Sequence, residues 1–139
     1  MSVFAQKVYV GNTIHKDNVY CNIKNGYIYL GDPICPSKVL AYFDGKYIFE
    51  KESDKVLYTY SNGYIYRGRS LKKENLIGEY KCRLHKLYTY EDKETYVIRK
   101  RQSGETSCIN DDRLIFRSTG WVHPLVWYFI INHFVIVFE

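Results

Sequence analysis

Basic and aromatic side chains are interspersed between Arg67 and Arg101. This stretch holds 11 lysines and arginines against 5 acidic residues, whereas the whole chain of 139 residues has a formal net charge of +5. In proteins that bind single strands, cationic side chains hold the phosphates and aromatic rings stack on the bases. The stretch therefore predicts a surface for single-stranded nucleic acid. Its candidate residues are Arg67, Arg69, Lys81, Arg83, Tyr88, Arg99, Lys100 and Arg101. Because acidic residues interrupt it, an ordinary solvated face is the competing interpretation.

A second candidate chemistry is nucleophilic catalysis by Cys108. A reactive thiol needs a neighbouring base, and His85 or His123 could supply one if the fold brought it close. No nucleophile elbow or other catalytic signature surrounds Cys108 in "QSGETSCINDD". The competing interpretation is a polar loop that leads into a strand. We therefore expect a protein that is not an enzyme, with a Cys108-dependent hydrolase as the least favoured alternative.

The sequence predicts no metal and no cofactor. Its nearest mixed ligand pair, Cys82 and His85, lacks the second pair that a structural zinc site needs. No glycine-rich phosphate loop occurs either. The four cysteines are widely spaced and the start "MSVFAQKVYVG" does not resemble a secretory signal, so free thiols in the cytoplasm are expected.

Three Asx-Gly pairs predict the β-hairpins on which many of these candidate residues lie. Asn25-Gly26, Asp44-Gly45 and Asn62-Gly63 each lie between apolar or aromatic alternations, which is the strongest short signal for a β-hairpin. A two-residue turn fixes the register of the strands that flank it. The inward pairs expected from this register are Ile23/Ile28, Cys21/Leu30, Tyr42/Tyr47, Leu40/Phe49, Tyr60/Ile65 and Tyr58/Arg67.

The same register places several tyrosines on the mixed, outward face. Tyr29, Ile48 and Tyr66 each stand three residues after a turn glycine, and this recurrence indicates packing between hairpins. Tyr27 and Tyr64 stand one residue after their glycines, with Lys46 in the middle unit. They complete the candidate binding surface, which would suit a sugar or a peptide as well as nucleic acid.

The three hairpins recur about every 18 or 19 residues, which is typical of stacked or radially arranged repeats. We expect one all-β domain over residues 1–139, made of an array of β-hairpin repeats. The hairpins are expected at about 19–31, 39–50 and 56–68, with a degraded unit at about 76–101 and a C-terminal apolar segment at 121–139.

The repeat resembles the bacterial four-fold β-flower repeat proteins. The stretches "NGYIYLG", "KVLAYFDGKYIF", "KVLYTYSNGYIYRG" and "NLIGEY" carry this resemblance over roughly residues 19–80. It implies hairpins arranged as petals about a central axis, and it implies no assigned activity. The basic 81–101 stretch and the apolar C-terminus depart from the repeat.

The C-terminal run "PLVWYFIINHFVIVFE" admits two structures. Pro124 could begin a buried helix, but the many β-branched residues and the central Asn132-His133 favour two strands that close the fold as a hairpin. The run is too short and too interrupted for a membrane span. Its apolar 125–138 segment, together with strand edges, predicts a homo-oligomer. The function expected overall is a non-catalytic binding or assembly module of unknown ligand.

Overall fold

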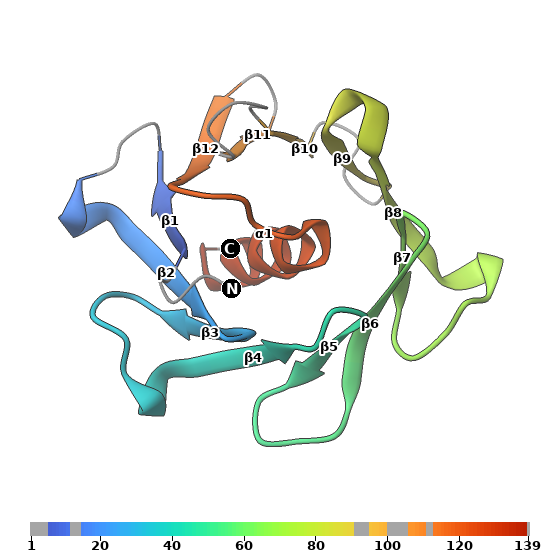
Figure 1. The fold of residues 1–139 in the computed structure, drawn as a ribbon, viewed down its shortest axis with the longest axis horizontal. Helices are drawn as coiled ribbons and strands as arrows, with labels where there is room; N and C mark the ends of the chain where they lie inside the picture. Colours follow the sequence, from blue (N-terminus) through green and yellow to red (C-terminus); the bar gives the residue numbers. More distant parts are fainter. Residues whose placement is uncertain (1–5, 12–14, 91–94, 100–105, 111–112, 139) are drawn as a thin grey trace.

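A computed structural model describes residues 6–11, 15–90, 95–99, 106–110 and 113–138 of the chain. In this part of the chain, twelve antiparallel strands follow one another around a closed ring, and β12 returns to pair with β1 (Figure 1). The strands are β1 Gln6–Val10, β2 Val19–Lys24, β3 Tyr27–Leu30, β4 Val39–Phe43, β5 Tyr47–Glu50, β6 Val56–Ser61, β7 Tyr64–Arg67, β8 Leu76–Lys81, β9 Lys86–Thr89, β10 Thr95–Arg99, β11 Thr106–Asn110 and β12 Arg113–Ser118. The helix α1, Pro124–Phe138, lies inside the ring (Figure 1).

The ring is built from hairpins that radiate as petals, as the repeat pattern predicted. The petals are β2–β3, β4–β5, β6–β7, β8–β9, β10–β11 and the pair β12–β1, which joins the two ends of the chain of strands. A hairpin cannot bury its own inner face, so each petal depends on its neighbours and on the helix. The all-β class and the radial arrangement are therefore confirmed, with one helix added.

The first and third Asx-Gly hairpins have the predicted register. Asn25 and Gly26 have φ angles of 52° and 85°, and Asn62 and Gly63 have 51° and 86°, which is the positive pair that a type I′ turn requires. Ile23 faces Ile28, and Tyr60 faces Ile65. In both petals the side chains predicted to point inward at these positions do so.

The prediction for the middle hairpin is wrong. Phe43 pairs with Ile48, and Tyr42 pairs with Phe49 rather than with Tyr47. Here Gly45 and Lys46 are the two central turn residues, because the Asp44 N–H donates to the Tyr47 carbonyl at 3.2 Å. The Asp44 carboxylate also accepts from the backbone N–H groups of Lys46 and Tyr47, at 2.9 and 2.8 Å.

Moving the turn by one residue exchanges the two faces of the petal. Ala41, Phe43 and Ile48 therefore face the core, and Tyr42, Tyr47 and Phe49 face outward. The backbone confirms the correct alignment of the repeats, because the carbonyls of Gly26, Lys46 and Gly63 each accept a hydrogen bond from the next petal. Lys46, and not Gly45, is thus the counterpart of Gly26 and Gly63.

Seams between petals carry β-bulges at equivalent positions. The register shifts in the seams β1/β2, β3/β4, β5/β6, β7/β8 and β11/β12, and in each of them the first strand of a petal contains one extra residue. The extra residues are Tyr20, Leu40, Leu57, Ile77 and Ile115, and all of them pack in or against the core. A bulge bends the strand and lets two consecutive residues face the same side. The ring can therefore turn the corner between petals while filling its interior.

The preference for two C-terminal strands is also wrong, and the helical alternative with Pro124 in its first turn is confirmed. The side chains of Leu125 through Ile131 are buried on every side of α1, which is typical of a helix enclosed by other elements. Gly78 on β8 lies next to the Tyr128 ring of the helix, and a Cβ there would be 3.4 Å from this ring and only 2.9 Å from the Tyr88 carbonyl oxygen. The ring therefore surrounds a helical core.

This packing removes part of the basis on which the homo-oligomer was predicted. The apolar residues from Leu125 to Ile131 are covered by the protein's own strands, and the described strands form a closed sheet without free edges. The oligomeric state thus stays a prediction. Within the part of the chain that the structure describes, no helix has the length and apolar character to cross a membrane.

Candidate functional site

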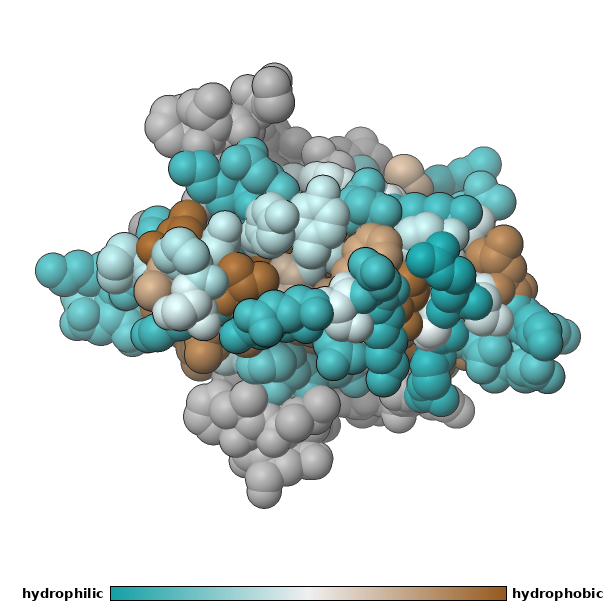
Figure 2. All heavy atoms as spheres, turned by 90° about the horizontal axis from the view of Figure 1, so that it is seen from below, coloured by the Kyte–Doolittle hydropathy of each residue, from teal (hydrophilic) through white to brown (hydrophobic). Residues whose placement is uncertain are grey.

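Five aromatic rings line up on the outside of the first two Asx-Gly petals. We call Tyr29, Tyr27, Tyr42, Phe49 and Tyr47 the outer aromatic strip. Their successive ring centroids are 6.2, 4.6, 6.3 and 6.0 Å apart, within the range of aromatic pair contacts. The strip crosses from β3 to β4 and β5. Figure 2 views the ring from the side of these strands and shows pale and brown residues between hydrophilic ones in teal.

A surface cavity of about 540 Å³ opens beside this strip. The rings of Tyr27, Tyr42 and Phe49 form its aromatic side, together with Pro36 and Val39. Residues 50–54, which comprise the last residue of β5 and most of the loop before β6 and are called here the loop 50–54, also line it. Small-molecule sites are typically concave and mostly apolar, with a few polar groups at defined positions, and this cavity has that composition.

Tyr42, which lines the cavity, differs from the residues at the equivalent positions of the flanking petals. The equivalent positions in the flanking petals are Asn22 and Thr59, which are each 1 % exposed. Asn22 Nδ2 donates to the Gly31 carbonyl at 2.8 Å, and the Thr59 hydroxyl donates to the Gly68 carbonyl at 2.7 Å. These bonds hold the outgoing loop against the petal. Tyr42 has the larger ring at that position, and the loop 50–54 lies beyond it.

Gly26 allows the Tyr42 ring to approach the neighbouring petal. A Cβ at this residue would contact the Tyr42 ring at 2.9 Å and would collide with the Phe43 carbonyl oxygen. The ring therefore packs on the turn backbone and against Tyr27. The aromatic side of the cavity is held by backbone contacts rather than by side chains alone.

Three carboxylates and one ammonium line the cavity. Glu50, Glu52 and Asp54 are exposed, and the Lys51 ammonium donates to the Ser37 carbonyl at 3.5 Å. Lys55, outside the lining, lies 3.8 Å from the Glu50 carboxylate. Such an exposed pair contributes little energy and can rearrange. The cavity is thus locally acidic in a chain whose formal net charge is +5.

The next ring along the strip already carries cations of the protein itself. The Arg69 guanidinium carbon lies 4.4 Å from the centroid of the Tyr47 ring, and the Lys46 nitrogen lies 5.1 Å from it. Both distances are within the reach of a cation–π interaction. Among the described residues, no lysine or arginine lies over the rings of Tyr27, Tyr42 or Phe49 in this way.

The predicted basic surface is divided by the structure. Arg69 lies over the Tyr47 ring of the outer aromatic strip. The Lys81 ammonium lies 5.2 Å from the centroid of the Tyr88 ring on the petal β8–β9. Arg67 ends β7 and Arg83 lies in the short 3-10 helix Cys82–Leu84, both exposed. Arg99 ends β10. Lys100 and Arg101 lie outside the described residues.

Tyr27 and Tyr64 are exposed as predicted, with 43 % and 38 % of their surface accessible. Their surroundings differ. Tyr27 borders the cavity, whereas Tyr64 pairs with Glu79, whose carboxylate accepts a hydrogen bond from the Tyr90 hydroxyl at 2.8 Å. Proximity to that carboxylate and burial raise the pKa of Tyr90 to about 12, with burial the larger cause.

The residues considered for catalysis stand on different elements of the fold. Cys108 is 2 % exposed in the core cluster on β11. The His123 ring lies against Phe43 and Tyr60 at the start of α1, and the His85 ring lies 3.5 Å from the Tyr80 hydroxyl. In the described part of the chain, no three His, Cys, Asp or Glu side chains are grouped closely enough to hold a metal ion.

Sequence reasoning missed most of the cavity. The glycine alignment predicts that Tyr42, Tyr47 and Phe49 point inward, and residues 51–54 fall between two of the expected hairpins. The shared pattern Tyr-Ile-Tyr/Phe at 27–29, 47–49 and 64–66 is the signal that would have found them. Aligning the repeats on this pattern instead of on the glycines gives the observed faces.

The petals and the enclosed core define the class of protein. A family model described as a 6-fold beta flower protein matches residues 1–85, which is more than half of the chain, and the chain belongs to this family. This confirms the resemblance to β-flower proteins, with six petals rather than four. No curated protein and no solved structure matches the chain significantly.

Proposed function

We propose that this β-flower is a non-catalytic binding module that takes a small ligand into the cavity beside the outer aromatic strip. The observation that carries the proposal is the convergence of Tyr27, Tyr42 and Phe49 from two petals on one concave surface of about 540 Å³. Rings held in place before binding lose little conformational freedom when a ligand arrives, which favours affinity.

The contrast between petals supports this choice of site. The counterparts of Tyr42 in the flanking petals close their loops with hydrogen bonds from Asn22 and Thr59. Tyr42 stands where these two petals have a residue that donates a hydrogen bond to the loop, and it lines the cavity instead. Ligand binding supplies a reason for that departure from the repeat.

The test is a screen of uncharged and charged small fragments by protein-observed NMR. Binding should perturb the amide signals of Tyr27, Tyr42, Phe49 and Ser53 together, and Tyr42→Ala should abolish these perturbations. Tyr64→Ala is the control, since Tyr64 is the counterpart of Tyr27 in another petal and is an exposed tyrosine that does not line the cavity. A screen in which no fragment perturbs this set of residues would exclude the proposal.

Single-stranded nucleic acid remains the alternative ligand, and the geometry supports it less. Arg69 and Lys81 lie over the faces of Tyr47 and Tyr88, which a stacked base would have to displace. The alternative requires binding of an oligothymidine that weakens steeply with salt. Replacing Arg99, Lys100 and Arg101 by glutamine should flatten that slope. Absence of binding at low salt would rule it out.

A further inference from the structure

The rings and the carboxylates of the cavity together point to the charge of its ligand. We propose that the cavity binds an organic cation whose ammonium group is alkylated. This inference rests on the proposed function and adds the chemical class of the ligand. It is carried by three separate features of the described residues, namely the three aromatic residues that line the cavity, the local excess of carboxylates and the two cations that lie over the neighbouring Tyr47 ring.

The ring arrangement suits a bulky, weakly hydrated cation. Tyr27 and Tyr42 are tilted by 47° with centroids 4.6 Å apart, and Phe49 is stacked at 29° on Tyr42. Rings at different angles around one space can present several negative π-faces to the same ligand. Quaternary ammonium groups are recognised in this way because methyl groups contact the rings while the charge is attracted by them.

The loop 50–54 supplies the complementary charge. Glu50, Glu52 and Asp54 outnumber Lys51 at the cavity, although the chain as a whole is basic. Carboxylates at the rim attract a cation and repel an anion, so they give selectivity as well as affinity. An uncharged sugar would gain the stacking contacts without using this charge.

Tyr47 shows that the strip accepts cations. Lys46 reaches its ring from the turn of the same petal, and Arg69 reaches it from the segment after β7. Tyr47 is continuous with the cavity through Phe49, at 6.0 Å between centroids. The protein therefore satisfies one ring of the strip with its own cations, and the three rings at the cavity are the ones left for a ligand cation.

The experiment compares choline with 3,3-dimethylbutan-1-ol, its uncharged isostere, by NMR titration of the folded chain. Choline should perturb the amides of Tyr27, Tyr42 and Phe49 and bind roughly 5- to 30-fold more tightly than the isostere, as expected for a cation–π contact. A third arm uses N-acetyl-trimethyllysine methylamide. Tighter binding of this probe assigns the cation to a partner's modified lysine, and tighter binding of choline assigns it to a free metabolite; either result supports the proposal.

Variants that replace the carboxylates of the cavity by amides test the contribution of their charge while keeping the side-chain shape. Glu50→Gln, Glu52→Gln and Asp54→Asn combined should weaken choline by about tenfold or more and leave binding of the isostere unchanged. Glu74→Gln, at an exposed carboxylate outside the cavity, is the matched control and should have no effect. Equal binding of choline and its isostere would overturn the inference. So would a choline titration without response in a protein whose cavity still binds uncharged fragments, and that result would leave the proposed function intact.

Discussion

The His123 imidazole accepts a hydrogen bond at Nδ1 from the backbone N–H of Leu125, at 3.0 Å. The His123 carbonyl accepts from the Trp127 N–H at 3.0 Å, so this residue caps the N-terminus of α1 immediately before Pro124. Its ring lies between Phe43 and Tyr60, each with a centroid 4.5 Å away. Burial lowers the pKa of His123 to about 4. The cap thus requires the neutral imidazole, whose lone pair protonation would remove.

We predict that acid weakens the fold through this cap. The unfolded chain binds a proton at His123 near pH 6.5, whereas the folded chain does so only near pH 4. Stability is therefore full above pH 6.5 and is lost as the pH falls toward 4, by up to about 3 kcal/mol at roughly 1.4 kcal/mol per pKa unit. Urea unfolding at a series of pH values measures this loss.

His123→Asn keeps a capping oxygen without a titrating group and should flatten the pH dependence over this window. His133, whose pKa burial also lowers, contributes a residual slope of the same sign. His15→Asn, at an exposed histidine that caps the 3-10 helix Lys16–Asn18, is the control and should keep the wild-type slope. An unchanged slope in His123→Asn would contradict the prediction.

Gly78 should tolerate no side chain. In Gly78→Ala the new Cβ would lie 2.9 Å from the Tyr88 carbonyl oxygen and 3.4 Å from the Tyr128 ring. We expect a loss of about 1–3 kcal/mol in unfolding free energy, as for other overpacked cores. Gly120→Ala is the control, because its nearest contact is an ordinary 3.5 Å from the Gln6 side chain. Chemical denaturation measures the unfolding free energy of both variants. An equal loss of unfolding free energy in the two variants would refute the prediction.

The two turn glycines Gly26 and Gly45 should differ in their response to alanine. Both have positive φ, 85° and 105°, so alanine at either position costs about 1–2 kcal/mol in backbone strain. At Gly26 the added Cβ also collides with the Phe43 carbonyl and the Tyr42 ring, whereas at Gly45 it meets open space. Thermal unfolding should therefore show a larger loss for Gly26→Ala. A larger loss for Gly45→Ala would mean that Asp44-Gly45 is the true turn centre.

The four thiols should divide into two classes. Cys35 and Cys82 are accessible, whereas Cys21 and Cys108 are buried, and burial raises the pKa of Cys21. Iodoacetamide should label the first two in the native protein and the others only after unfolding. Fast native labelling of Cys108 would contradict this assignment and support the hydrolase alternative.

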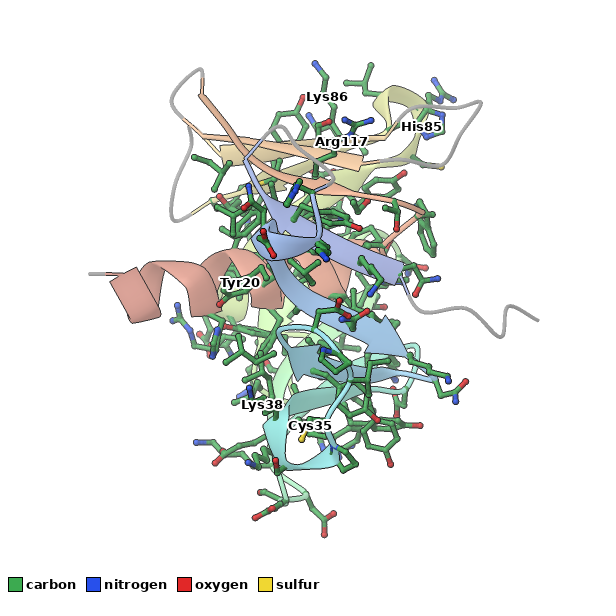
Figure 3. The ribbon with its side chains drawn as sticks, turned by 90° about the vertical axis from the view of Figure 1, so that its left-hand side faces the viewer. Tyr20, Cys35, Lys38, His85, Lys86 and Arg117 are labelled. Carbon is green, nitrogen blue, oxygen red and sulfur yellow. The ribbon has the colours of Figure 1, made fainter. Side chains whose placement is uncertain are left out.

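Cys35 should also be more reactive than an ordinary exposed thiol. Its sulfur lies 3.1 Å from the Ser37 hydroxyl in the segment that Figure 3 shows near Lys38, and this hydrogen bond lowers the pKa of Cys35. Ser37→Ala should slow its alkylation at neutral pH. Mass spectrometry of the modified peptide measures the rate, with Cys82 as the internal standard.

The turn sequences made the hairpins predictable, and one of them also caused the wrong register that was predicted for the petal β4–β5. Asn-Gly places two residues with positive φ in the turn, so the registers of Ile23/Ile28 and Tyr60/Ile65 follow from the sequence. Asp-Gly has the same signal, but the Asp44 carboxylate instead binds the backbone of Lys46 and Tyr47. A side-chain hydrogen bond thus moves the turn by one residue.

The bulges and the helix depend on contacts across the ring that a local pattern does not contain. Leu40 and Leu57 look like ordinary members of an alternating strand, and only the neighbouring petal makes them extra residues in a seam. The β-branched residues of α1 favour strands in isolation. Enclosure by twelve described strands supplies the burial that overrides this propensity.

The order of elements along the chain constrains how the ring can form. Helix α1 follows β12, so a ribosome delivers every described strand before it delivers the residues that fill the interior. Until then the inner faces of the petals have only water or one another to contact. We therefore expect the ring to reach its final packing only after α1 has been synthesised, and we expect a nascent chain that ends before α1 to be exposed to proteases and to self-association.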